Sequence, residues 1–194
     1  MKIKYATISK TGRRSNNEDC FNVLELPEHN RFMGIVCDGM GGHSFGEVAS
    51  EAVCNAISKY WQENTDTPDS DKKVVMACKK ACNAINQKSY DLSHAEMGTT
   101  MVMASIEGDK VTIAHVGDSR CYLQRQSEGL LYQPRTMCAL TSGGKLFHVV
   151  SSATVQKSLF PTSGSSPFRK ETEYYSVLMA CTRAWHPTSY KQGC

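Results

Sequence analysis

The stretch Phe32-Met33-Gly34-Ile35-Val36-Cys37-Asp38-Gly39-Met40-Gly41-Gly42 decides the fold of this chain. Its first six residues form a short apolar run, which is typical of a buried strand. Asp38 follows at the end of that strand, and the glycines after it allow a tight turn. A carboxylate beside a bare backbone carbonyl suits a hard divalent cation, which prefers oxygen ligands. For this stretch taken alone, a simple Asp-Gly loop remains the alternative interpretation.

Two further acidic segments favour the cation interpretation. Asn17-Glu18-Asp19 lies upstream between two strand-like runs, and Gly117-Asp118-Ser119-Arg120 lies downstream of another apolar run. Acidic side chains at the ends of several strands can meet at one end of a sheet. The three segments together therefore indicate a site for divalent cations.

The periodicity of apolar residues predicts strands, then two helices, then more strands, which is an α+β pattern. Ser44 and Glu47 have the spacing of a capping box and predict the start of the first helix. An amphipathic pattern predicts the second helix over residues 71–90. Strands are expected over residues 4–9, 21–26, 32–37, 99–106, 110–116 and 120–124. The residues of the second helix expected to face inward are Val74, Val75, Ala77, Cys78, Ala81, Cys82 and Ile85.

Four motifs in this order resemble the metal-dependent Ser/Thr protein phosphatases of type 2C, the PPM family, in their bacterial form. The resemblance runs from about Tyr5 to about Tyr132. It implies a β-sandwich of two antiparallel sheets flanked by helix pairs (αββα), here incomplete. The matching segments are Arg14–Asp19, Val36–His43, Met97–Thr100 and Val116–Arg120.

The resemblance also implies the chemistry of the site. The family hydrolyses phosphoserine and phosphothreonine in proteins with metal-activated hydroxide, using two Mn²⁺ or Mg²⁺ ions. Asp38 would bridge the two ions and the Gly39 carbonyl would bind one of them. Glu18 and Asp19 would complete the site, either directly or through metal-bound waters.

Two more residues receive roles from the resemblance. Asp118 would hold a third, weaker metal site, and Arg14 would clamp the phosphate with its guanidinium fork. Asp118 has a plainer alternative as a turn after a strand, and Glu18 and Asp19 have one as part of a solvated loop. His115 lies in an apolar strand and is interpreted as a core histidine. Gly98-Thr99-Thr100 is interpreted as a tight, packed entry to a strand.

The last third of the chain differs from the rest. Up to Gln133 there are 15 Lys/Arg and 17 Asp/Glu, whereas from Pro134 onward there are 7 Lys/Arg and 2 Glu. We therefore divide the chain into a family part, residues 1–133, and a non-family tail, residues 134–194, expected to be poorly ordered. The tail's codons, read one base earlier, permit Thr-Lys-Asp-His near residue 134 and Ser-Asp-Gly-Leu near residue 178. This suggests that the tail is translated out of frame.

The family's later aspartates are absent, because the last Asp of the chain is Asp118. The chain as written is therefore expected to bind metal weakly and to be inactive or nearly so. A catalytically dead module that binds phosphoproteins or acts as a scaffold is the alternative function. An unrelated α+β binding domain with chance acidic loops is a third interpretation.

The bulk composition limits the classes of binding partner and the cellular location that we expect. The net charge of +3 belongs to the tail, so it gives no reason to expect nucleic acid. We find neither an apolar run of membrane-spanning length nor the apolar core of a signal peptide. Nine cysteines without metal-type spacing indicate free thiols in a reducing cytoplasm. The expected partners are phosphorylated proteins, with a Ser/Thr kinase acting in opposition.

Overall fold

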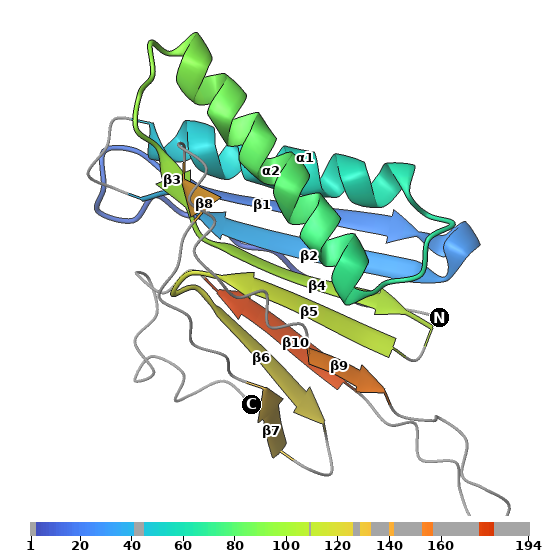
Figure 1. Cartoon of the computed structure of the whole chain (residues 1–194). Helices are drawn as coiled ribbons and strands as arrows, with labels where there is room; N and C mark the ends of the chain where they lie inside the picture. Colours follow the sequence, from blue (N-terminus) through green and yellow to red (C-terminus); the bar gives the residue numbers. More distant parts are fainter. Residues whose placement is uncertain are drawn as a thin grey trace, which may run out of the picture.

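The computed structural model describes residues 3–40, 45–108, 110–125, 129–132, 140–141, 153–156 and 175–180. Two helices cover one face of an antiparallel five-stranded sheet, and a three-stranded sheet lies on the other side (Figure 1). The α+β class and the antiparallel sheets agree with the sequence prediction. Within the described residues, helices flank only the larger sheet, so one of the two outer layers of the αββα arrangement is present.

The larger sheet has the strand order β1-β2-β4-β5-β9. Strands β1 (Asp19–Leu26) and β2 (Arg31–Asp38) form a hairpin closed by a short 3-10 turn, Pro27–His29. Strands β4 (Met101–Glu107) and β5 (Lys110–Val116) continue the sheet, and β9 (Ala153–Gln156) pairs with β5 at its edge. A separate two-stranded ladder joins β3 (Gly98–Thr99) to β8 (Leu140–Thr141).

Helices α1 (Gly46–Glu63) and α2 (Asp71–Asp91) form the layer over the larger sheet. The second helix begins where the sequence predicts, because the Ser70 hydroxyl accepts a hydrogen bond from the Lys73 N–H at 3.3 Å. The residue at the N-cap of α1 is Phe45, which makes no side-chain capping bond. The predicted capping residue, Ser44, lies outside the described residues, so the capping box stays a prediction. Phe45 instead packs its ring against the core.

The core between helices and sheet is built from the alternate residues of β2 and the inward faces of both helices. Met33, Ile35 and Cys37 are all within 1% of complete burial. The prediction for α2 holds at Val74, Ala77, Cys78, Ala81 and Ile85 but is wrong at Val75, which is 39% exposed.

A buried group of charges fills the end of this core furthest from Asp38. The Arg31 guanidinium donates a hydrogen bond to the Glu107 carboxylate. Its Nε atom lies 3.5 Å from Asp69 Oδ1. Lys73 Nζ is 3.1 Å from Asp69 Oδ1 and 4.5 Å from the centroid of the Trp61 ring. Charges this deeply buried require close partners, and each of these has one. Lys73 is therefore buried at one edge of the inward face of α2, whereas Val75, at the opposite edge, is exposed.

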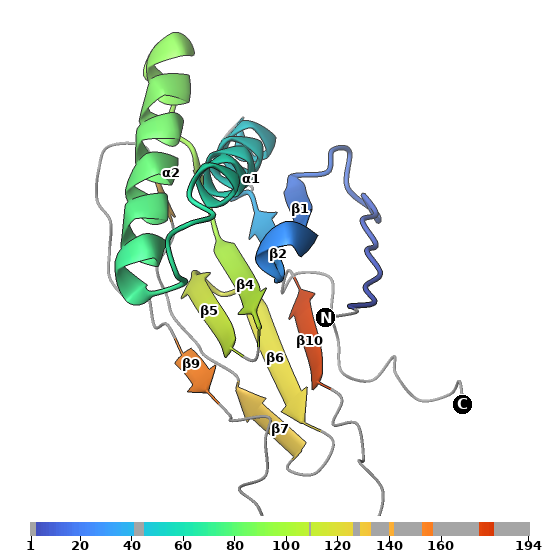
Figure 2. The same ribbon diagram turned by 90° about the vertical axis from the view of Figure 1, so that its right-hand side faces the viewer.

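The opposite face of the larger sheet is covered by strands β6 (Arg120–Arg125), β7 (Gly129–Tyr132) and β10 (Tyr175–Ala180), in the order β10-β6-β7. Figure 2 shows this second sheet beyond the first one, on the side away from the helices. The side chain of Met179 on β10 lies over Gly34 of β2, where an added methyl group would be 2.8 Å from its terminal carbon. Gly34 thus gives the two sheets room to approach.

Residues 3–11 are not in a strand, which corrects the expectation for residues 4–9. This segment runs beside β1 in Figure 2, and the Tyr5 ring lies 5.4 Å from that of Phe32. Ile8 is 79% exposed. Alternation alone does not make a strand, because the backbone groups also need a partner strand, and in the described part of the chain none pairs with this segment.

The predicted tail begins at residue 134, and its described residues are confined to three short strands. Leu140–Thr141, Ala153–Gln156 and Tyr175–Ala180 pair with strands of the family part. The remaining tail residues lie outside the described part of the chain, so the proposed boundary and the expected poor order stay predictions. Within the described residues, no helix has the length and apolar character needed to cross a membrane.

Candidate functional site

Asp19 and Asp38 face each other across the open end of the β1–β2 hairpin. They are register partners in the antiparallel ladder. The Gly39 N–H donates to the Glu18 carbonyl at 3.0 Å, so the next pair inward, Asp19 and Asp38, is a non-hydrogen-bonded pair. Side chains of such pairs are the closest across two strands, and two negative charges there repel one another. A cation between the two carboxylates would remove that repulsion.

The two aspartates point away from the helices. Their neighbours Cys20 and Cys37 contribute to the core under α1, and successive side chains of a strand alternate between the faces of a sheet. The aspartate carboxylates therefore lie on the side of the second sheet, at its end. Asp38 is 4% exposed and Asp19 is half-buried.

Thr100 fixes the backbone of Asp38 from the other side. Its Oγ1 accepts from the Asp38 N–H at 3.0 Å, and its own N–H donates to the Asp38 carbonyl at 2.9 Å. The same hydroxyl lies 2.6 Å from the Ser119 Oγ. Thr100 and Ser119 thus form a buried hydroxyl pair behind Asp38. The sequence analysis assigned Thr100 only to packing, and the paired threonines of the Met97–Thr100 motif were the signal available for this role.

A second junction joins the site to the start of α1. A methyl group on Gly39 would lie 2.2 Å from the Gly46 carbonyl oxygen and 2.8 Å from the Glu18 carbonyl oxygen. Ser50 Oγ, one turn into α1, donates to the Glu18 carbonyl at 2.7 Å. The first turn of the helix is therefore packed directly onto the two chain segments that carry the acidic residues. Neither Gly46 nor Ser50 was singled out from the sequence.

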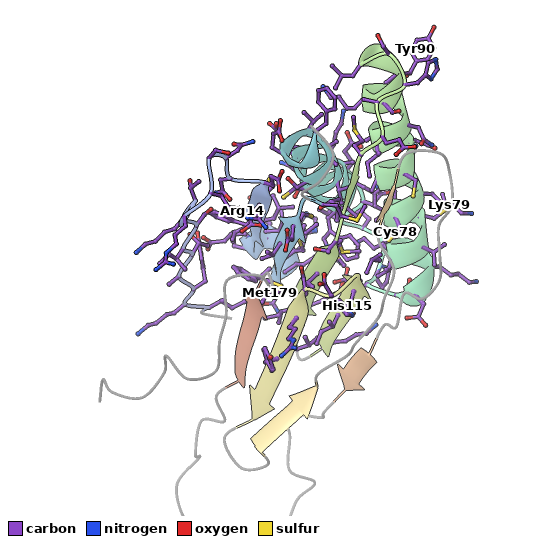
Figure 3. All side chains as sticks on the ribbon, turned by 90° about the vertical axis from the view of Figure 1, so that its left-hand side faces the viewer. Arg14, Cys78, Lys79, Tyr90, His115 and Met179 are labelled. Atoms are coloured by element: carbon purple, nitrogen blue, oxygen red, sulfur yellow. The ribbon has the colours of Figure 1, made fainter. Side chains whose placement is uncertain are left out.

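Glu18 and Arg14 form an ion pair near the start of α1, where a methyl group on Gly46 would lie 3.1 Å from the Glu18 carboxyl carbon. Arg14 Nη1 donates to Glu18 Oε2 at 3.0 Å, with the arginine side chain 47% exposed and the glutamate side chain 16% exposed. Figure 3 shows Arg14 on the N-terminal segment, outside the sheet. A guanidinium has several N–H donors, so one bond to Glu18 leaves others for an anion.

Asp118 belongs to the same end of the sheet but lies on a different segment. It is exposed, in the turn from β5 to β6 that crosses from one sheet to the other. Its neighbour Ser119 reaches the site through Thr100 and accepts at its carbonyl a 2.7 Å hydrogen bond from His115 Nε2. His115 is fully buried, as expected of a core histidine. Burial lowers its pKa, against the opposing effects of the Ser119 carbonyl and the Asp118 carboxylate.

The predicted site residues thus gather at one end of the larger sheet, at different distances from one another. Glu18, Asp19, Asp38 and Gly39 are joined by the β1–β2 ladder, and Arg14 is tied to Glu18, while Asp118 lies on the neighbouring turn. Within the described residues, no three His, Cys, Asp or Glu side chains converge closely enough to hold a metal ion. Their oxygen atoms are donors of the kind that a hard cation prefers.

Comparison with known proteins identifies the family of this arrangement. The sequence profile described as "Protein phosphatase 2C" matches residues 9–138. A serine/threonine phosphatase stp of Listeria welshimeri is 35% identical over 140 residues, which are 70% of this chain and 52% of that protein. The chain spans about half the length of the curated relatives that it matches at this level of identity.

Solved structures agree with this fold. The serine/threonine phosphatase Stp1 of Staphylococcus aureus is 25% identical, with a TM-score of 0.56 over 71% of this chain and 57% of that one. The catalytic domain of the phosphatase PstP, crystallised with two manganese ions, is 24% identical with a TM-score of 0.52 over 87% of this chain and 68% of that one. At 24% identity, the similarity to PstP shows a shared fold and nothing further.

Proposed function

Since the chain belongs to the protein phosphatase 2C family, we propose that it forms part of a metal-dependent phosphatase acting on phosphoserine and phosphothreonine in proteins. The observation that carries this proposal is the opposed pair Asp19 and Asp38 within the family match. Two carboxylates held face to face are an arrangement that a divalent cation stabilises.

In this proposal Asp38 and Asp19 hold Mn²⁺ or Mg²⁺ together with the Gly39 carbonyl. Glu18 supports the same ions, and Asp118 belongs to a third, weaker site. Manganese in the related PstP structure supports the choice of a divalent ion. When bound, such ions neutralise phosphate oxygens and make water a stronger nucleophile near neutral pH.

The chain's own residues would orient the substrate and protect the geometry. Arg14 would donate two parallel hydrogen bonds to the phosphate oxygens, as a guanidinium fork can. The pairing of its Nη1 with Glu18 ties the guanidinium to the residue that precedes Asp19. Thr100 would keep the Asp38 backbone in place, because it binds both the N–H and the carbonyl of that residue.

The test is a comparison of Asp38→Asn with the matched surface variant Asp66→Asn. Asp66 is exposed in the loop between α1 and α2 and lies outside the proposed site. Binding of Mn²⁺ to the full chain is followed by calorimetry, and phosphate release from a phosphothreonine peptide is followed with Mn²⁺ present. We expect Asp38→Asn to weaken Mn²⁺ binding at least about 100-fold and to abolish any turnover, with Asp66→Asn unchanged.

Equal Mn²⁺ affinity in the two variants would contradict the proposal. Phosphopeptide binding that needs no metal would favour the phosphoprotein-binding alternative instead. We further propose that turnover by this chain is low, because no aspartate follows Asp118 to add carboxylates to the centre.

We propose that residues 134–194 are an out-of-frame tail. The end of the family match at residue 138, close to the predicted boundary at 133, supports this. Reading the DNA across the codons for Arg125 to Arg135 tests it: a stop codon in the shifted frame before the codons for Ser176–Thr182 contradicts it. Substrates phosphorylated by an opposing Ser/Thr kinase, and a location in the cytoplasm, belong to the same proposal and are supported by the family and by the free thiols.

A further inference from the structure

A fully buried histidine on β5 lies at the junction of the two sheets. His115 pairs with Val102 of β4, and it comes two residues after Ile113. Val102 and Ile113 both belong to the apolar cluster between the sheets, against which Met179 of β10 packs. Because alternate residues of a strand share one face, the imidazole also faces the second sheet, on the side where Asp38 lies (Figure 3).

The imidazole has one hydrogen bond and one bare nitrogen. Its Nε2 lies 2.7 Å from the Ser119 carbonyl oxygen. A carbonyl only accepts hydrogen bonds, so Nε2 carries the proton. Burial lowers the pKa of His115 and favours the neutral ring, in which Nδ1 is a bare acceptor. Within the described residues, this buried Nδ1 has no hydrogen-bond partner.

The bare Nδ1 makes an imidazole costly at this position. A buried acceptor without a partner lowers stability, whereas an apolar side chain of similar size would fill the space without that cost. The hydrogen bond from Nε2 to the Ser119 carbonyl is the contribution that an apolar side chain could not make.

Ser119 continues the contact to Asp38. Its Oγ lies 2.6 Å from Thr100 Oγ1. Thr100 in turn accepts from the Asp38 N–H at 3.0 Å and donates its own N–H to the Asp38 carbonyl at 2.9 Å. Ser119 and Thr100 are both buried, so water competes little with these bonds. A continuous series of hydrogen bonds therefore joins His115 on β5 to Asp38 at the end of β2.

The turn between His115 and Ser119 contains a glycine with a positive φ. Gly117 has a φ of 104°, a conformation that favours glycine. Glycine also allows the backbone more conformations than any other residue, so the turn alone defines the position of Ser119 poorly. The imidazole bond joins the two ends of this turn and restricts where the Ser119 hydroxyl lies.

We propose that His115 is a positioning residue for the metal site: its bond to the Ser119 carbonyl holds the Ser119 hydroxyl against Thr100, which holds the backbone of Asp38. The inference rests on the proposed function, because it concerns a carboxylate that would bind Mn²⁺. Loss of a group that orients a metal ligand lowers metal affinity by about 10–100-fold. His115 acts through two intervening residues, so the expected loss is at the lower end of this range.

The first experiment determines the protonation of the imidazole in the wild-type chain. Nitrogen-15 NMR of the full chain labelled on histidine reports whether Nε2 carries hydrogen, and His115→Gln identifies the signal by its disappearance. We expect a proton on Nε2 that exchanges slowly with water. An Nε2 without a proton, or with a rapidly exchanging one, would overturn the proposal, because the buried bond to Ser119 would then be absent.

The second experiment compares Mn²⁺ affinity among variants of the full chain by calorimetry. His115→Leu removes the donor at similar volume, whereas His115→Gln keeps an N–H at the position of Nε2. Thr112→Val is the matched control, because Thr112 is buried on the same strand and its hydroxyl has no hydrogen-bond partner among the described residues. We expect His115→Leu to weaken Mn²⁺ binding about tenfold, and the other two variants to stay within about threefold of the wild type. No loss in His115→Leu, or an equal loss in either of the others, would overturn the proposal.

Ser119→Ala tests the route through the serine hydroxyl. If His115 acts only by placing that hydroxyl, Ser119→Ala and His115→Leu should each weaken Mn²⁺ binding about tenfold, and the variant that carries both should bind no more weakly than either one. Losses that multiply to about 100-fold would overturn this route.

Amide exchange in the metal-free chain separates this inference from the proposed function. The Asp38 N–H donates to Thr100 Oγ1, so its exchange with deuterium reports the last bond of the series. Relative to the Met103 amide on β4, we expect the Asp38 amide to exchange about tenfold faster in His115→Leu, with protection restored in His115→Gln. An unchanged ratio would overturn the proposal. A wild-type chain that binds no Mn²⁺ would contradict the proposed function, whereas faster exchange in His115→Leu would still show that His115 supports Asp38.

Discussion

Replacing Gly39 by alanine tests the junction between the acidic site and α1. The added methyl group would lie 2.2 Å from the Gly46 carbonyl oxygen and 2.8 Å from the Glu18 carbonyl oxygen. Both neighbours are backbone atoms, so neither can rotate away. Relief of the contact therefore requires the first turn of α1 to move from the hairpin by roughly 1 Å.

That movement lowers the free energy of unfolding through two contributions. Overpacking of this kind costs about 1–3 kcal/mol, and loss of the Ser50–Glu18 hydrogen bond adds about 1 kcal/mol. We expect Gly39→Ala to lower the free energy of unfolding by about 2–4 kcal/mol. For a chain of this size the corresponding fall in Tm is about 10 °C.

Gly34→Ala, on β2 and five residues before Gly39, is the matched control. Its methyl group would meet the terminal carbon of Met179 at 2.8 Å, the movable end of a flexible side chain. We expect a loss of about 1 kcal/mol or less. Urea unfolding followed by circular dichroism measures both variants. If Gly39→Ala is no more destabilising than Gly34→Ala, the first turn of α1 does not lie against the hairpin as closely as the structure shows.

Three further predictions concern buried polar contacts. Thr100→Val removes the acceptor for the buried Asp38 N–H, and urea unfolding should show a loss of about 1–3 kcal/mol; no loss would contradict the role of that hydroxyl. Arg31→Met leaves Asp69 and Glu107 without their shared guanidinium and should cost about 3–5 kcal/mol in the same assay, whereas a gain would contradict it. Burial acts to raise the pKa of Glu107, but the Asp69 N–H and Arg31 outweigh it and leave the pKa below the usual 4.5. A carboxyl group whose pKa is lower in the folded state stabilises above its unfolded pKa, and this contribution is lost as the pH falls through the folded value. The wild type should therefore lose more thermal stability than Glu107→Gln between about pH 6 and about pH 3; parallel melting curves would refute this.

The sequence predicted elements well where local signals and packing agree. The second helix was expected over residues 71–90 and spans Asp71–Asp91, because a serine cap and a regular apolar face coincide there. The exception is Lys73, which is buried while Val75 is exposed. Periodicity counts lysine as a surface residue, and its partners Asp69 and Trp61 come from other segments. Whether a lysine at such a position is buried or exposed depends on its tertiary contacts.

The N-terminal segment was predicted less well for a different reason. Residues 4–9 alternate as a half-buried strand would, yet residues 3–11 lie outside any strand. A helix satisfies its backbone hydrogen bonds within itself, whereas a strand depends on a neighbour from elsewhere in the chain. The quality of a strand prediction is therefore limited by whether its partner is in place.

The candidate site contains one feature that local sequence pattern predicts and others that depend on tertiary contacts. Asp38 at the end of a buried strand followed from local pattern, and the structure has β2 end at that residue. Its pairing with Asp19 did not follow, since register depends on the length of the turn at Pro27–His29. Its support from Thr100 depends on a contact between residues 62 positions apart. Such contacts arise from tertiary structure and leave little trace in one sequence.

Register also links the acidic site to the thiols beneath it. A strand that slips by one residue turns every side chain to the opposite face. Such a slip of β2 would turn Cys37 outward and bring Asp38 under α1, where a carboxylate would have to be buried among apolar side chains. The cost of that arrangement fixes the register, so the same alternation that places two aspartates toward the second sheet places two cysteines against Cys54. Any substitution that changes the pairing of β1 and β2 should therefore disturb the aspartates and the cysteines together.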